Sequence, residues 1–100
     1  MTAYEQLIAG KTKVDRAKEI ARALDHPTRM SILEILHAKG RATVTDLFMA
    51  MRMDQSTCSM HLSILRKCGL VVTSRDGKFI IYQIDERVLG GVVETFSQLL

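Results

Sequence analysis

Residues 54–70 are rich in small side chains that can donate and accept hydrogen bonds. Read at 3.6 residues per turn, they predict one helix with an apolar stripe on one side and a polar face on the other. Asp54 is a suitable N-cap, because its carboxylate can accept the backbone amide of Thr57, and Gly69 is a suitable left-handed stop. Short polar side chains and free amides at the start of a helix suit base edges and phosphates in a DNA major groove. The simpler alternative is that the Ser and Thr side chains only cap the helix.

Two cysteines, Cys58 and Cys68, fall in this same predicted helix. Ten residues of helix separate them by about 15 Å, whereas a disulfide needs Cα atoms within about 7 Å, so reduced thiols are expected. Cys58 lies on the apolar stripe and is predicted to be a small core residue. Cys68 follows Lys67 at the helix end and is predicted to be structural, with a redox-sensitive thiol as the alternative.

The sequence does not contain the residue patterns that enzymes use. It has no Gly-rich phosphate loop, no paired carboxylates at the end of a helix or strand, and no spacing of His, Cys and carboxylates typical of a metal site. His26 and His37, with Asp25 and Met30 close by in sequence, do not form a ligand cluster. We therefore predict no catalytic residues, no metal and no cofactor.

Length and charge narrow the class of protein. The 100 residues are enough for one domain with a modest core, and the hydrophobic fraction of 47% is typical of a globular protein. The net charge of +3 comes mainly from residues 41–78, which favours a polyanionic partner. No apolar run approaches the ~20 residues that span a bilayer, and the N-terminus does not resemble a signal peptide. We expect a cytoplasmic protein that does not enter a membrane.

The helix of residues 54–67 is predicted to be one half of a helix-turn-helix unit. A helix over 4–24, with a break at Gly10-Lys11 as an alternative, and a core helix over 27–38 precede it. Residues 41–44 could form a short strand. Thr43 and Asp46 then resemble a capping box that begins a helix of about two turns. Arg52-Met53 makes the turn into the next helix.

A β-hairpin and a last helix are predicted to follow. Residues 70–74 and 79–84 are rich in β-branched and aromatic side chains, and they bracket Asp76-Gly77, which favours a tight turn with both central residues at positive φ. Asp85 then caps an apolar helix over 86–100. The fold class is mainly α with a small β-hairpin, in the order α-α-(short β)-α-α-β-β-α, and residues 1–100 form a single winged helix-turn-helix domain.

Four segments in this order resemble the ArsR family of bacterial repressors. The segments are Leu24–Leu33, Gln55–Leu62, Leu65–Val71, and Arg75–Lys78 continuing to Tyr82. The resemblance covers residues 20–85. It implies a winged helix-turn-helix homodimer that pairs through its first and last helices and leaves DNA when an inducer binds. The aliphatic faces of 4–24 and 86–100 also exceed what one small core needs, which favours the same pairing, although both helices could instead wrap one core.

Candidate DNA contacts lie on the polar face of the 54–67 helix and at the hairpin tip. Gln55, Ser56 and Thr57 are predicted to reach base edges, and Ser59, Met60 and His61 follow on the same exposed face. The Met60 methyl group could contact thymine in place of the basic residue that many relatives have there. His61 could equally hold a local hydrogen bond. Phosphate or minor-groove contacts are assigned to Arg75 and Lys78, with weaker positioning contacts from Arg41, Arg52 and Lys67.

The two metal sites typical of this family cannot be built from the sequence. Residues 44–50 lack the cysteines of one site, and the last helix offers carboxylates at Asp85, Glu86 and Glu94 but no histidine for the other. We therefore predict a homodimeric repressor of the metal-independent branch, bound to double-stranded DNA at a near-palindromic operator, with an unidentified inducer. Two alternatives remain: a winged-helix protein-interaction module without DNA binding, and a sensor of thiols or metal at a new site.

Overall fold

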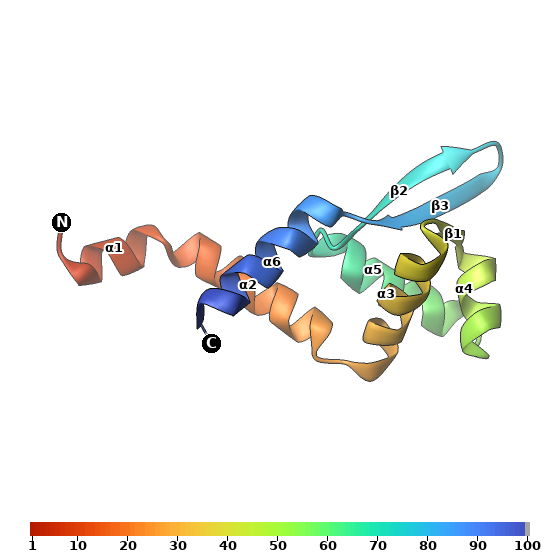
Figure 1. Cartoon of the computed structure of the whole chain (residues 1–100), viewed down its shortest axis with the longest axis horizontal. Coiled ribbons are helices and arrows are strands. Elements are labelled where there is room, and N and C mark those ends of the chain that lie inside the picture. Colours follow the sequence, from red (N-terminus) through yellow and green to blue (C-terminus); the bar gives the residue numbers. More distant parts are fainter. Residues whose placement is uncertain (100) are drawn as a thin grey trace.

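The computed structural model describes residues 1–99, apart from the side chains of Thr12 and Leu99. Six helices and three strands follow one another along this part of the chain (Figure 1). In order, they are α1 (Ala3–Ala9), α2 (Lys11–Leu24), α3 (Pro27–Lys39), β1 (Ala42–Thr43), α4 (Val44–Met51), α5 (Gln55–Lys67), β2 (Val71–Asp76), β3 (Phe79–Ile84) and α6 (Glu86–Leu99). The predicted order of elements is confirmed, with the first predicted helix divided into α1 and α2.

Local capping residues set where the central helices begin. Pro27 occupies the first turn of α3, where its missing amide proton removes no hydrogen bond. At α4 the Thr43 hydroxyl accepts the Asp46 amide (3.1 Å) while the Asp46 carboxylate accepts the Thr43 amide (3.0 Å), so the predicted capping box is confirmed. The Asp85 carboxylate accepts the amides of Arg87 and Val88 at the start of α6.

The three strands form one antiparallel sheet in the order β1-β3-β2. The predicted short strand is confirmed, since Ala42 pairs with Tyr82 and Thr43 pairs with Ile81. The hairpin is also confirmed, but its turn differs from the prediction. Because the ladder continues to the pair Asp76–Phe79, the two central residues are Gly77 and Lys78 rather than Asp76 and Gly77. Of these two, only Gly77 has positive φ (62°), as expected of a type II′ hairpin turn, which has glycine at its first central position.

The core lies where α3, α4 and α5 meet the base of the sheet. Ile32, Leu36, Leu47, Leu62, Leu65 and Leu70 are all less than 2% exposed. Cys58 is fully buried among them, which confirms its predicted place in the core. This packing fixes the back of α5 and leaves its other side at the surface.

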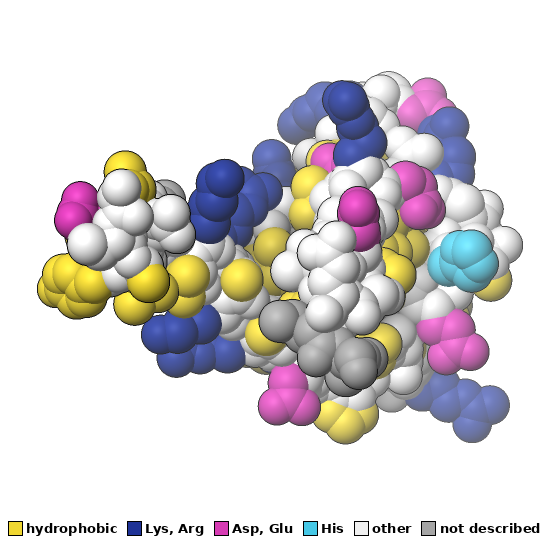
Figure 2. Space-filling view, turned by 60° about the vertical axis from the view of Figure 1, so that its left-hand side comes forward, with side chains coloured by type: hydrophobic (Ala, Val, Ile, Leu, Met, Phe, Trp, Pro, Cys, Tyr) yellow, Lys and Arg dark blue, Asp and Glu magenta, His cyan; other side chains and the backbone are white. Residues whose placement is uncertain are grey.

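The N-terminal region projects from this body (Figure 1). The predicted 4–24 helix is interrupted at Gly10, the alternative that its glycine suggested, and α1 has no buried residue. The molecule measures 52 × 27 × 22 Å, and its radius of gyration of 15.7 Å exceeds the roughly 13 Å of a compact chain this long. Hydrophobic side chains gather on the projecting arm (Figure 2).

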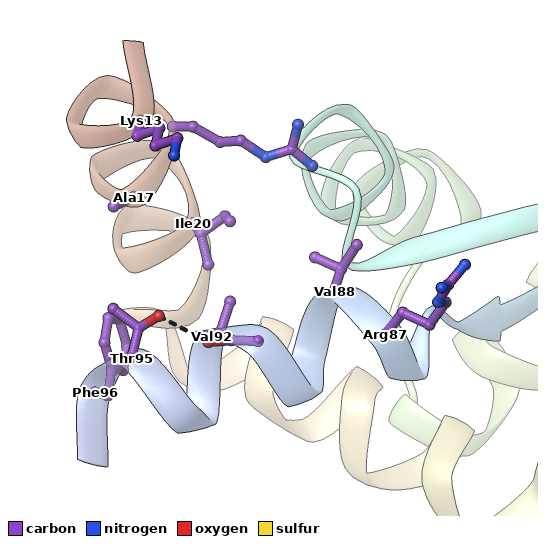
Figure 3. A pocket seen from close by; sticks show the side chains of 10 residues that line it. Lys13, Ala17, Ile20, Arg87, Val88, Val92, Thr95 and Phe96 are labelled. Carbon is purple, nitrogen blue, oxygen red and sulfur yellow. Dashed lines mark hydrogen bonds between the residues drawn. The ribbon is translucent and has the colours of Figure 1, made fainter. Parts of the chain in front are cut away.

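The last helix runs without a break through Gly90 and Gly91. It crosses α2 in the view of Figure 1, and both line the groove drawn in Figure 3. The predicted end of this helix at Leu100 lies outside the described residues. None of the helices described is long and apolar enough to cross a membrane.

Candidate nucleic-acid interface

The start of α5 is held by its predicted cap. The Asp54 carboxylate accepts the Thr57 amide (2.9 Å) and the Thr57 hydroxyl (2.8 Å), and these hydrogen bonds lower the pKa of Asp54. The Thr57 hydroxyl proton is therefore committed to the cap, although its oxygen can still accept. Arg66 and Lys67 lie in the last turn, where cations complement the helix dipole, and Gly69 follows at φ 85°.

Four of the six residues assigned to the polar face of α5 are exposed. Gln55, Ser56 and Ser59 are open to solvent, and Met60 is 52% exposed, while Thr57 is half-buried. None of these side chains carries a charge. This face can offer hydrogen bonds and one apolar contact, so attraction to phosphates has to come from other parts of the surface.

His61 does not lie on the exposed face, so its expected position was wrong. The His61 side chain is only 5% exposed and packs against residues around the start of α3. Its Nδ1 lies 3.4 Å from Nη1 of Arg29, and its ring lies 4.7 Å from that of His26. The local hydrogen bond weighed as its alternative role is the arrangement that the structure contains.

The β2–β3 hairpin carries Arg75 and Lys78 near its tip, and both side chains are exposed. Lys78 Nζ lies 5.5 Å from the centre of the Phe79 ring, a cation–π contact that leaves the ammonium at the surface. Arg41, assigned a weaker contact, forms a 3.4 Å ion pair with Asp76 of the hairpin. Arg52 lies in the turn before α5 at φ 54°, and Lys67 is exposed at the far end of α5.

The hairpin and the start of α5 border one notch of about 330 Å³. Gln55 and Ser59 line it from α5, and Lys78 lines it from the hairpin. The structure thus brings these three predicted residues together. Thr45 and Phe79 border the same notch and were not predicted as site residues. The sequence signal for Thr45 was a second hydroxyl at the start of α4, and that for Phe79 was an aromatic side chain next to the turn. Phe79 is 54% exposed.

Neither cysteine thiol is exposed on this surface. Cys58 and Cys68 are both buried and free; burial, and then the Asp54 charge, raise the pKa of Cys58, and the Cys68 thiol donates to the Leu65 carbonyl (3.3 Å). Among the described residues, no three His, Cys, Asp or Glu side chains are grouped so that they could hold a metal ion.

These features define the class of protein as a winged helix-turn-helix regulator, in which α4 and α5 form the helix pair and the β2–β3 hairpin forms the wing. The sequence profile described as "Bacterial regulatory protein, arsR family" matches residues 26–73. The chain belongs to the ArsR family of transcriptional regulators.

Three similar proteins illustrate this membership. An uncharacterized HTH-type transcriptional regulator of Methanocaldococcus jannaschii is 38% identical over 77 residues, which cover 76% of this chain and 86% of that protein. The HTH-type transcriptional regulator YgaV of Escherichia coli K12 is 27% identical over 99% of this chain and 97% of its own length. The homodimeric winged helix-turn-helix DNA-binding domain of a possible ArsR-family regulator from Mycobacterium bovis matches with a TM-score of 0.74 at 28% identity, covering 89% of this chain and 84% of that domain.

Proposed function

We propose that this chain is a cytoplasmic, homodimeric repressor that binds a near-palindromic DNA operator and leaves it in response to a signal. The observation that carries the proposal is the notch where Gln55 and Ser59 of α5 meet Lys78 of the wing. A helix that offers uncharged hydrogen-bonding groups can read base edges, while a neighbouring cation binds the phosphate backbone. Residues 1–100 act as one domain in this proposal.

The roles of individual residues follow from their exposure. Gln55, Ser56, Ser59 and Met60 contact base edges, and Thr57 contributes through its hydroxyl oxygen. Arg75 and Lys78 contact phosphates or the minor groove. His61 acts within the protein rather than on DNA, because its ring is buried.

The surface outside the DNA-binding half supports dimerisation. Large apolar side chains are exposed on all three terminal helices: Tyr4, Leu7 and Ile8 on α1, Val14 on α2, and Val93 and Phe96 on α6. Between α2 and α6 lies a groove of about 330 Å³, with Ile20, Val92 and Phe96 among its lining (Figure 3). A second copy would cover these faces. The Mycobacterium bovis relative is described as homodimeric, and a two-fold dimer here would place its α5 helices about 34 Å apart in successive major grooves.

The test is binding to a DNA duplex from the region upstream of the chain's own gene, with scrambled duplex as competitor, over a range of salt concentrations. We expect saturable, sequence-selective binding that weakens with salt in proportion to the phosphates contacted. Ser56→Ala and Gln55→Ala should each reduce the preference over competitor by about 1–3 kcal/mol if they remove a base contact. Ser63→Ala is the matched control, because Ser63 is also exposed on α5 but lies beyond the first two turns.

Two results would count against this proposal. Sequence-blind binding that Ser56→Ala leaves unchanged would mean that α5 does not read bases. No binding at low salt would favour a winged-helix module that contacts proteins.

A further inference from the structure

Arg29 connects the end of α2 to the middle of α5. Its Nε donates to the Ala23 carbonyl (2.6 Å) and its Nη2 donates to the Arg22 carbonyl (3.0 Å). These carbonyls belong to the last turn of α2, where the helix itself supplies no donors. The remaining terminal nitrogen, Nη1, lies 3.4 Å from Nδ1 of His61 on α5. One planar guanidinium therefore contacts two helices that are far apart in sequence.

The contact between Arg29 and His61 requires a neutral imidazole. A guanidinium has donors only, so Nδ1 of His61 must keep its lone pair to accept the hydrogen bond. His26 lies beside His61, and its Nδ1 accepts the Thr28 amide (3.2 Å) and so caps α3. The two imidazole rings lie 4.7 Å apart and are tilted by 52°. Protonating His61 would remove the acceptor for Arg29 and add a positive charge beside it.

The surroundings of His61 favour its neutral form. Burial, then His26, then Arg29 lower the pKa of His61 below its ordinary value. His26 precedes α3 and Arg29 lies on it, so both act on His61 from the helix that packs against α5. The cluster of His26, Arg29 and His61 therefore loses the hydrogen bond between Arg29 and His61 as the pH falls, and the positive charge on His61 then repels Arg29.

We propose that Arg29 and His61 are positioning residues that hold α5 against the end of α2, and that α5 keeps its DNA-binding orientation only while His61 is neutral. This inference rests on the proposed function. In a dimer built on α2 and α6, the end of α2 belongs to the part that pairs. The contacts of Arg29 with the end of α2 and with His61, here called the clamp, would therefore set the orientation of α5 relative to the dimer. That orientation determines whether two α5 helices can enter two grooves at once.

The predicted pH dependence has a definite sign. Below about pH 6.5 a histidine in an unfolded chain takes up a proton, whereas His61 in the fold does so only at lower pH. The stability that this cluster contributes is therefore complete above that value and is lost as the pH falls through the pKa of folded His61. Added positive charge by itself would strengthen attraction to DNA at acid pH. The clamp predicts the opposite.

The experiment measures affinity for the same upstream duplex at about pH 7.5 and at a series of lower pH values, down to the lowest at which circular dichroism shows the chain folded, because folded His61 takes up its proton below the ordinary histidine pKa of about 6.5. We expect the affinity of the wild-type chain for this duplex to fall about tenfold or more across this series, a change within the usual range of coupling between two sites. His61→Gln keeps an acceptor for Arg29 and does not titrate, so it should bind normally at the higher pH and lose most of the pH dependence. His37→Gln is the matched control, because His37 is exposed on α3, and it should keep the wild-type profile.

A second measurement does not need DNA. Hydrogen exchange of the α5 amides should accelerate in Arg29→Lys, which loses the fork of donors, while circular dichroism shows the helices still folded. Equal acceleration in α4 would mean general destabilisation and would contradict a positioning role.

The two proposals fail in different ways. An absence of binding at about pH 7.5 would overturn the proposed function, and exchange in α5 would then decide on the clamp alone. Binding at the higher pH that stays constant or strengthens on acidification, or a pH profile that His61→Gln does not alter, would overturn the clamp.

Discussion

The first two turns of α5 present a surface without charge. Gln55, Ser56 and Ser59 offer hydrogen bonds, and Met60 offers a flexible apolar side chain at 52% exposure. The nearest cations on this helix are Arg66 and Lys67, in its last turn. Phosphate attraction must therefore depend on the wing and on backbone amides, which makes Met60 the position where one added charge should have the clearest effect.

We expect Met60→Lys to tighten DNA binding and to increase its salt dependence. One new phosphate contact should steepen the slope of log affinity against log salt by about 1. Titrations of upstream and scrambled duplex should show that both gain affinity, and selectivity should fall because the contact of Met60 with a base edge is lost. Met60→Leu is the control and should leave the slope unchanged. An unaltered slope in Met60→Lys would mean that this side of α5 does not approach the backbone of DNA.

Sequence patterns predicted side-chain contacts between residues close in sequence, but not those between residues far apart. The caps at Asp54 and Thr43 were predicted correctly, because each depends on groups three residues apart. His61 was misplaced, although it follows Cys58 by three residues and precedes Leu65 by four, which are neighbouring positions on a helix. Its partner Arg29 lies 32 residues earlier, and no local pattern reveals that contact.

At the scale of elements, the wing was predicted correctly but its turn was not. Asp76-Gly77 indicated a hairpin, and β3 has its predicted bounds, but β2 runs to Asp76, two residues beyond the predicted strand. The pairing of the strands sets the position of the turn. Because Asp76 pairs with Phe79, the strands pair up to the turn itself and Gly77 becomes its first central residue. A positive φ of 62° is then needed at Gly77 alone, with open space around it.

This geometry predicts opposite effects for two glycine substitutions. Gly77→Ala should lower the free energy of unfolding by about 1–2 kcal/mol, the cost of a left-handed conformation for a residue with a Cβ. Gly90→Ala should raise it by about 0.5–1 kcal/mol, because Gly90 lies inside α6 with nothing within 4 Å of an added Cβ. Urea unfolding at a single protein concentration measures both.

The same pair of variants also tests where the wing acts. Gly77→Ala should weaken DNA binding through a disordered tip, whereas Gly90→Ala should not. A destabilising effect of Gly90→Ala would indicate that this side of α6 is covered by another molecule. Equal effects of the two substitutions on stability would contradict the turn described here.

In a single copy of the chain, the terminal helices α1, α2 and α6 leave large apolar side chains exposed. Helix α1 has seven residues and none is buried, yet isolated helices shorter than about 12–15 residues are marginal in water. Hydrophobic period and turn residues predicted the fold, because both are local, and the resemblance of four segments to the ArsR family predicted the family. They did not predict how far α1 projects, since apolar spacing looks the same whether a face packs on its own core or on a second copy.

Val93→Glu should therefore separate the protein into monomers. Val93 is 58% exposed on α6, and a carboxylate buried against a second copy would be left without a partner. Sedimentation velocity should show a dimer for the wild-type chain and a monomer for this variant, and only the wild-type Tm should rise with protein concentration. Met49→Glu is the control: Met49 is 67% exposed but lies on α4, so this variant should remain dimeric.

The DNA affinity of the same variants extends the argument to function. A Val93→Glu monomer keeps α5 and the wing but can engage one half-site at a time, so it should lose most of its preference for the upstream duplex and show a shallower salt slope. Met49→Glu should remain dimeric whatever it does to affinity, which separates assembly from charge. If Val93→Glu remained dimeric, the α6 face would not be the interface, and the exposed apolar residues of α1 would be the next surface to vary. If it became monomeric and bound DNA as the wild type does, the requirement for two copies would be wrong while the assignment of α5 to DNA would stand.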